Sequence, residues 1–105
     1  MTRALVFGAT GHIGAHIVRA LLAEGHQVRA AYRQPRFLTT LDGLAVERVR
    51  LDLETFEGVR GALDGCEWVF HAAGAYPRAR ERYQDAMARA MHATQHILRL
   101  LAEVK

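Results

Sequence analysis

The apolar positions in the first 32 residues change from an uninterrupted run to a helical spacing and then back to a short run. The continuous run Ala4–Phe7 is typical of a strand that is buried on both faces. The segment His12–Glu24 has the helical spacing, and Gly25 follows where a helix would end. A second strand is predicted over Gln27–Tyr32. The apolar face of the helix is predicted to be Ile13, Ile17, Leu21 and Leu22.

Strand and helix patterns continue to alternate through the rest of the chain. We expect a loop over 33–41, a strand over 45–51, a short helix over 54–63 ended by Gly65, a strand centred on Trp68–Phe70 and a long helix over 80–104. Alternation of this kind indicates right-handed crossovers and a parallel sheet, with strand order 3-2-1-4 if the turn after the first strand is the switch point. The inward positions are predicted to be Phe56, Val59 and Leu63 in the short helix, and Tyr83, Met87, Met91, Thr94, Ile97, Leu98 and Leu101 in the long one.

The turn between the first strand and the first helix is rich in glycine, Gly8-Ala9-Thr10-Gly11-His12-Ile13-Gly14. Gly8 permits a sharp turn, Gly11 allows a phosphate to approach the backbone, and Gly14 lets the helix lie close to the sheet. The N–H groups at the start of the helix can hold a pyrophosphate. The order strand, turn, helix and strand within about 30 residues is the context this motif requires, so a dinucleotide site is predicted.

Composition limits the remaining possibilities. A chain of 105 residues has room for one domain, and its composition is that of an ordinary globular protein. It contains neither an apolar run of membrane-spanning length nor a signal-like start, so we expect no membrane association and a cytoplasmic location. The single cysteine, Cys66, precedes the apolar strand Trp68–Phe70 and is interpreted as a small buried residue rather than a nucleophile.

The net charge of +3 does not indicate a nucleic-acid partner. All but one of the 14 basic residues are arginines, and they are scattered except for Arg78, Arg80 and Arg82. These three have no interleaved aromatic residues and belong to no recognisable nucleic-acid-binding motif, which favours a solvated loop. A modest positive charge also suits a domain that binds an anionic dinucleotide.

The end of the second strand predicts which dinucleotide is preferred. NAD-binding domains commonly carry an acidic residue there, which binds the ribose hydroxyls and would repel a 2′-phosphate. This chain has Tyr32 at that place, followed by Arg33, whose guanidinium can bind a phosphate with two hydrogen bonds. The predicted cofactor is therefore NADP, with NAD as the alternative. In a second interpretation Arg33 is only a solvated loop residue before Pro35.

Together with Asp52-Leu53 and the run Val69–Gly74, the glycine loop makes the whole chain resemble the extended short-chain dehydrogenase/reductase superfamily. It is most similar there to the nucleotide-sugar epimerase/dehydratases and the dihydroflavonol-reductase-like enzymes. The resemblance implies a Rossmann-type doubly wound α/β fold, of which residues 1–105 would form the NAD(P)-binding domain, truncated before a fifth strand. It also implies a pyrophosphate site at Gly8, Thr10, Gly11, His12, Ile13 and Gly14.

The resemblance assigns the remaining cofactor contacts. Asp52 and Leu53 would border the adenine, and Ala72, Ala73 and Gly74 would run beside the adenosine ribose and the nicotinamide. A purely structural interpretation is also open. Asp52 would then cap the following helix, and the alanines would be small for packing.

The chain departs from the superfamily at the catalytic pair. That pair is Tyr-x-x-x-Lys, in which the lysine lowers the pKa of the phenol so that it can transfer a proton. Tyr32, Tyr76 and Tyr83 are not followed by lysine at the fourth position, and the only lysine is Lys105. The pattern Asn-x-x-Gly-Thr at the start of the family's long helix is also missing, because Ala90 and Ala93 stand in the places of its asparagine and glycine when Thr94 is aligned. We therefore predict no catalytic residue within this chain.

The histidines add little further chemistry. His12 with His16, and His92 with His96, have the spacing of helical metal ligands, but no acidic residue lies inside either pair, so surface positions and no metal site are predicted. His71 is expected to pack beside the cofactor, and Tyr76 is a candidate substrate contact.

Three functions remain open. The first is the cofactor-binding portion of an oxidoreductase or epimerase that acts on a nucleotide-sugar or carbonyl compound. The second is a non-catalytic redox sensor, and the third is a pseudo-enzyme fragment. The long helix is a candidate contact for a homodimer.

Overall fold

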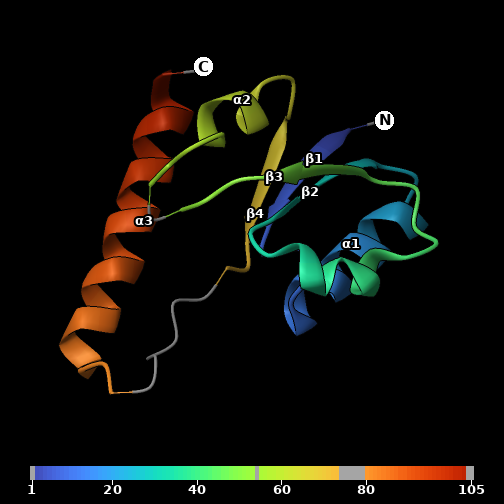
Figure 1. Ribbon diagram of the computed structural model, residues 1–105. Helices are drawn as coiled ribbons and strands as arrows, with labels where there is room; N and C mark the ends of the chain where they lie inside the picture. Colours follow the sequence, from blue (N-terminus) through green and yellow to red (C-terminus); the bar gives the residue numbers. More distant parts are fainter. Residues whose placement is uncertain (1, 54, 74–79, 104–105) are drawn as a thin grey trace.

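A parallel sheet of four strands forms the centre of the computed structural model, which describes residues 2–53, 55–73 and 80–103 (Figure 1). The strands are β1 (Arg3–Phe7), β2 (Gln27–Tyr32), β3 (Glu47–Arg50) and β4 (Trp68–His71). Their order in the sheet is β3-β2-β1-β4, and all three neighbouring pairs are parallel. This confirms the predicted Rossmann-type doubly wound α/β fold and its strand order. Gly74, Tyr76 and Arg78 lie outside the described residues.

Helices cover both faces of the sheet. They are α1 (His12–Ala23), the 3₁₀ helix η1 (Pro35–Leu41), α2 (Val59–Leu63) and α3 (Tyr83–Glu103). Successive side chains of β1 point to opposite faces. Leu5 and Phe7 therefore join a core with α2 and α3, whereas Ala4 and Val6 join a second core with α1 and η1 (Figure 1).

The predicted bounds of the first two strands agree with the structure, but the predicted third strand is too long. β2 has the predicted bounds, but β3 is limited to Glu47–Arg50, within the predicted 45–51. Its side chains are exposed or half-buried because it is an edge strand, and this explains its weak hydrophobic alternation. The N–H of Leu51 still donates to the carbonyl oxygen of Tyr32, at 3.0 Å, so the sheet pairing continues one residue beyond β3.

The predicted inward face of α1 is partly wrong. Its buried residues are Gly14, Ala15, Val18 and Leu21, whereas Ile13 is 61% exposed and Ile17 and Leu22 are half-buried. The glycine loop sets the rotation of the helix, because Gly14 lies directly against Gly8. Close packing of small residues thus replaces the expected contact of large ones.

The short helix begins later than predicted, at Val59 rather than Glu54. Phe56 has φ 63° and Gly58 has φ 80°, both in the left-handed region that a right-handed helix cannot contain. Val59 and Leu63 are buried as predicted, but Phe56 reaches the core from a loop. Cys66 is half-buried after this helix, and burial raises the pKa of its thiol, in agreement with a packing role.

The inward face of α3 is also partly wrong. Ile97 is buried and Leu101 half-buried as expected, but Ala86 and Leu100 provide the other buried positions. Tyr83, Met87, Met91 and Leu98 are all exposed, by 46 to 67%, and so is Thr94. Several large apolar residues therefore form a stripe on the outside of the helix, because Ala86, Ile97 and Leu100 occupy its buried face.

A buried arginine connects the sheet to α2. Arg29 of β2 is 9% exposed, and its Nη1 donates to the carbonyl oxygens of Ala62 and Asp64, each at 2.6 Å. Its Nε donates to Oε1 of Glu47 on β3, at 3.0 Å. These bonds satisfy the buried guanidinium and two carbonyl groups at the end of α2.

Within the described ranges, no helix has both the length and the apolar character needed to cross a membrane.

Candidate functional site

A cavity of about 810 Å³ opens at the carboxyl ends of the strands. Its walls come from the glycine loop, the segments that follow β2, β3 and β4, and one side of α3. Ligands of open parallel sheets bind at this edge, where the strand order reverses. Here the reversal lies between β1 and β4, next to the glycine loop.

The three glycines of the loop have different environments. A Cβ at Gly8 would lie 2.7 Å from the nitrogen of Ala73, and Gly8 also has φ +74°. A Cβ at Gly14 would overlap the carbonyl oxygen of Gly8. Close packing therefore requires glycine at both positions. Gly11 is different, because its φ of −75° suits any residue and its Cβ would meet only Gly8 O, at 3.4 Å.

Gly11 therefore leaves open space at the start of α1. No side chain caps this helix, and its first turn carries no acidic residue. The free N–H groups and the partial positive charge at a helix N-terminus attract anions. The loop has room, donors and charge suitable for a phosphate.

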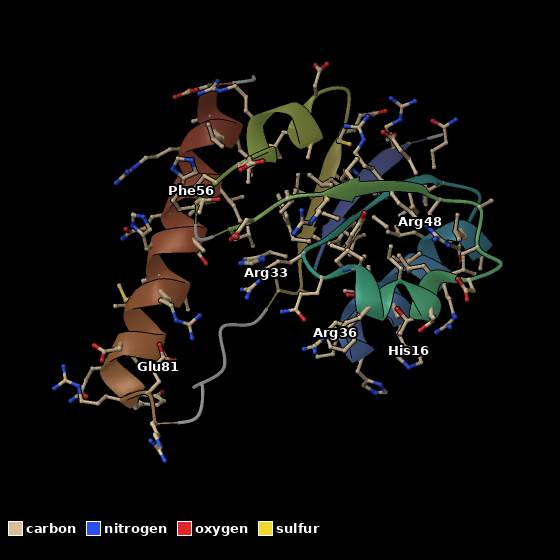
Figure 2. The ribbon with its side chains drawn as sticks, viewed as in Figure 1. His16, Arg33, Arg36, Arg48, Phe56 and Glu81 are labelled. Atoms are coloured by element: carbon tan, nitrogen blue, oxygen red, sulfur yellow. The ribbon has the colours of Figure 1, made fainter. Side chains whose placement is uncertain are left out.

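The segment after β2 gives the cavity a basic wall. Arg33, Gln34 and Arg36 all line it, and Figure 2 shows the two arginines on this side of the sheet. The guanidinium of Arg36 stacks over the Phe37 ring, 4.7 Å from its centroid, and the backbone oxygen of Arg33 accepts a bond from Nε of Arg50 at 3.2 Å. Oε1 of Gln34 is buried without a hydrogen-bond partner in the described structure. A ligand with donors and negative charge would complement this wall.

Asp52 and Leu53 line the cavity directly after β3. The residue that caps α2 is Gly58, so the alternative role of Asp52 as the cap of that helix is wrong. The N–H of Asp52 donates to the carbonyl oxygen of Glu57, at 3.2 Å, which ties Asp52 to the segment before α2.

His71 and Ala73 form the wall at the end of β4. The N–H of Ala72 donates to the carbonyl oxygen of Phe7, which holds this segment against β1. One edge of the His71 ring contacts the Phe7 ring, with centroids 5.9 Å apart, and partial burial lowers the pKa of His71. The imidazole is therefore neutral at pH 7.

One side of α3 completes the cavity, with Arg89, Ala90, His92, Ala93 and Thr94. Arg89 is held by Glu81, whose two carboxylate oxygens accept bonds from Nε and Nη2 at 2.9 and 2.7 Å. Sequence analysis did not assign these residues to the site. The available signal was the small pair Ala90 and Ala93, which leaves space on this side of α3.

The structure brings together about half of the predicted site residues. Those lining the cavity are Gly8, Thr10, Arg33, Asp52, Leu53 and Ala73. Gly11, His12, Ile13, Gly14 and Ala72 adjoin it without lining it, in the loop, the start of α1 and the end of β4. Gly74 lies outside the described residues.

The histidine pairs differ in their surroundings. His12 and His16 are exposed, with ring centroids 4.9 Å apart, and Figure 2 shows His16 on α1. His92 and His96 both contact the Phe56 ring instead of each other. In the described part of the chain, no three His, Cys, Asp or Glu side chains come together as metal ligands would.

Fold and site together define a dinucleotide-binding α/β domain. A protein family described as NAD(P)H-binding matches residues 8–102, and the chain belongs to this family. It forms the NAD(P)-binding portion of a protein of the short-chain dehydrogenase/reductase type.

Known proteins support this placement. The chain is 54% identical over 69 residues to sterol demethylase protein B of Methylococcus capsulatus, which covers 66% of this chain and 21% of that protein. It is 40% identical over 76 residues to cinnamoyl-CoA reductase 1 of Arabidopsis thaliana, covering 65% and 22%. A short-chain dehydrogenase/reductase superfamily protein from Agrobacterium tumefaciens, solved with bound NAD, has a TM-score of 0.72 and 27% identity, covering 93% and 28%. The chain spans about a fifth of the length of the curated relatives it matches.

Proposed function

We propose that this chain binds NADP(H) in preference to NAD(H) and serves as the cofactor-binding part of a reductase that acts on a carbonyl compound. The observation that carries the cofactor site is Gly11, where neither backbone conformation nor protein packing requires a glycine. An approaching pyrophosphate would require one. The nicotinamide supplies or accepts a hydride when the cofactor is bound.

The proposed roles of the chain's residues follow the family resemblance, and they are supported by the predicted residues that line the cavity. The backbone from Gly8 to Gly14 would hold the pyrophosphate, and Arg33 would bind the 2′-phosphate. Asp52 and Leu53 would border the adenine, and Ala72 and Ala73, with Gly74, would follow the ribose and nicotinamide. The name of cinnamoyl-CoA reductase supports a carbonyl substrate, and the chain's own sequence supplies no Tyr-x-x-x-Lys pair.

The site is tested with Gly11→Val. We expect this variant to keep its circular dichroism spectrum and to lose at least about tenfold in NADPH affinity, or about 1.4 kcal/mol, because the side chain fills the space of the phosphate. Calorimetric titration of NADPH measures the change. Unchanged affinity would mean that the loop is only a turn.

The cofactor preference is tested by titrating NADP and NAD against the parent chain and Arg33→Ala. A charge-assisted bond at an exposed site contributes about 1.5 kcal/mol, so we expect the substitution to weaken NADP about tenfold and to leave NAD nearly unchanged. Arg99→Ala, which removes an exposed arginine outside the cavity, is the matched control. An NADP/NAD ratio that Arg33→Ala does not alter would refute the assignment.

The proposal includes a homodimer formed through α3. Its support is the outer stripe of Tyr83, Met87, Met91 and Leu98, which follow one another at intervals of four, four and seven residues and so lie on one side of the helix. An exposed apolar surface of this kind favours association with a second copy.

The cytoplasmic location stays a prediction.

A further inference from the structure

Phe56 has a backbone conformation that is unusual for a large side chain. Its φ is 63°, in the left-handed region, where bulky residues are rarely found. Such a conformation is strained and persists only when surrounding contacts enforce it. Phe56 therefore needs contacts that hold it in place.

Those contacts come from α3. The Phe56 ring stacks on the His96 ring, with centroids 3.7 Å apart and planes 27° apart, and its centroid is 5.1 Å from that of His92. Figure 2 shows Phe56 lying beside α3, at the place where the loop after β3 approaches that helix. The ring is half-buried and also packs against the core beneath α3. A phenylalanine from the loop after β3 thus fastens that loop to a helix about 40 residues further along the chain.

This contact joins two walls of the cavity. Asp52 and Leu53 form the wall from the loop, and residues 89–94 form the wall from α3. His92 belongs to both the contact and the cavity, because it touches the Phe56 ring and lines the opening. Two hydrogen bonds link the residues on either side of Phe56 to the rest of the loop, because the N–H of Asp52 donates to Glu57 O and that of Val59 donates to Phe56 O. Movement of Phe56 would therefore move Asp52 and Leu53.

We propose that Phe56 is a positioning residue, held by His96 and His92, which sets the loop so that Asp52 and Leu53 form the wall of the cavity against the adenine half of the dinucleotide. This inference rests on the proposed function. Phe56 touches no reacting atom in this role and acts only through the loop.

Two substitutions separate positioning from general stability. Phe56→Gly removes the ring but relieves the backbone, because glycine readily adopts φ near 60°, whereas Phe56→Ala removes the ring and keeps the strain. A purely structural residue would affect folding more than binding. If Phe56 is a positioning residue, both variants should bind the cofactor more weakly than the parent, although Phe56→Gly should be the more stable of the two.

The experiment measures binding of NADPH and of adenosine 2′,5′-bisphosphate, which represents the adenine half alone, to the full chain at one fixed pH. We expect Phe56→Gly and His96→Ala to bind both probes with about tenfold lower affinity. A wall that is not held in one position loses ligand contacts that depend on its geometry. His96→Phe keeps a stacked ring and should bind like the parent. Arg99→Ala removes an exposed side chain of the same helix away from the cavity and is the control.

Each outcome decides between the hypotheses. Parent-like binding by His96→Ala and Phe56→Gly would overturn the positioning role and leave the proposed function intact. Weaker NADPH binding without weaker binding of the bisphosphate would also overturn it, because the defect would then lie outside the adenine half. If the parent chain binds neither probe, both the proposed function and this inference fail.

Discussion

The two halves of the cavity are built in different ways. The glycine-loop side, formed by β1, the loop and α1, consists of main chain packed at close distance, where Gly14 leaves no room for a Cβ. The opposite side is built from side chains of segments far apart in the sequence, such as Arg33, Asp52 and Arg89. The first side has a shape that would suit the part common to all dinucleotides. The second side can vary, and with it the preference for one cofactor over another.

The largest expected effect is a loss of stability in Gly14→Ala. The added Cβ would overlap the carbonyl oxygen of Gly8, so the helix must move away from the sheet. We expect about 3 kcal/mol of destabilisation, measured by urea denaturation. Gly61→Ala is the matched control, because Gly61 is also helical but has no atom within 4 Å of its Cβ position. It should be neutral or stabilising, by up to about 1 kcal/mol. Equal changes in the free energy of unfolding for the two variants would contradict the conclusion that Gly14 is tightly packed and Gly61 is not.

A slightly smaller effect is expected where Arg29 connects the sheet to α2. Arg29→Met keeps a long apolar stem in the core but leaves the carbonyl oxygens of Ala62 and Asp64 without their donor. The expected loss is about 2 kcal/mol in the free energy of unfolding, again from urea denaturation. Arg99→Met, at an exposed position, should change it by less than about 0.5 kcal/mol. A variant at residue 29 as stable as the parent would show that this connection does not stabilise the fold.

The outer stripe of α3 provides a test of the dimer. Met91→Glu places a charge in the proposed interface, where burial without a partner is unfavourable. We expect the dimer dissociation constant, measured by analytical ultracentrifugation, to rise at least about tenfold. Arg99→Gln changes the net charge by the same amount on another side of the helix and should have little effect. A monomeric parent chain would refute the dimer.

The smallest expected effect concerns pH. Partial burial lowers the pKa of His71 in the folded chain below its ordinary value of 6.5, so the unfolded chain takes up the proton first as pH falls. The contribution of neutral His71 is therefore present above pH 6.5 and is lost as the pH falls toward the lowered pKa. Because the ring is partly exposed, we expect a change of less than about 1 kcal/mol.

Proton NMR titration of the parent chain measures the His71 pKa directly, and His71→Gln should remove its share of the pH dependence of stability. A pKa at or above 6.5 would contradict the burial of this ring against Phe7.

Local sequence was sufficient to predict the glycine-loop side of the molecule. The apolar run of β1, the three glycines and Gly25 after α1 specify strand, turn and helix within one short segment, and both the strand order and the NAD(P)-binding family were predicted correctly. The reason is physical: a buried strand, a turn with positive φ and an amphipathic helix each leave a local pattern of residues.

Only the tertiary structure decided the other side of the cavity. The start of α2 at Val59 depends on the left-handed backbone of Phe56, which is held by His96 about 40 residues away. Met87 and Met91 face outward because α3 packs with Ala86, Ile97 and Leu100 on its buried side. Helical spacing predicts that residues share a face, but the direction of that face depends on packing between segments distant in the sequence. The sequence therefore predicted a phosphate site at the glycine loop. The fold determined which side chains line the rest of the cavity.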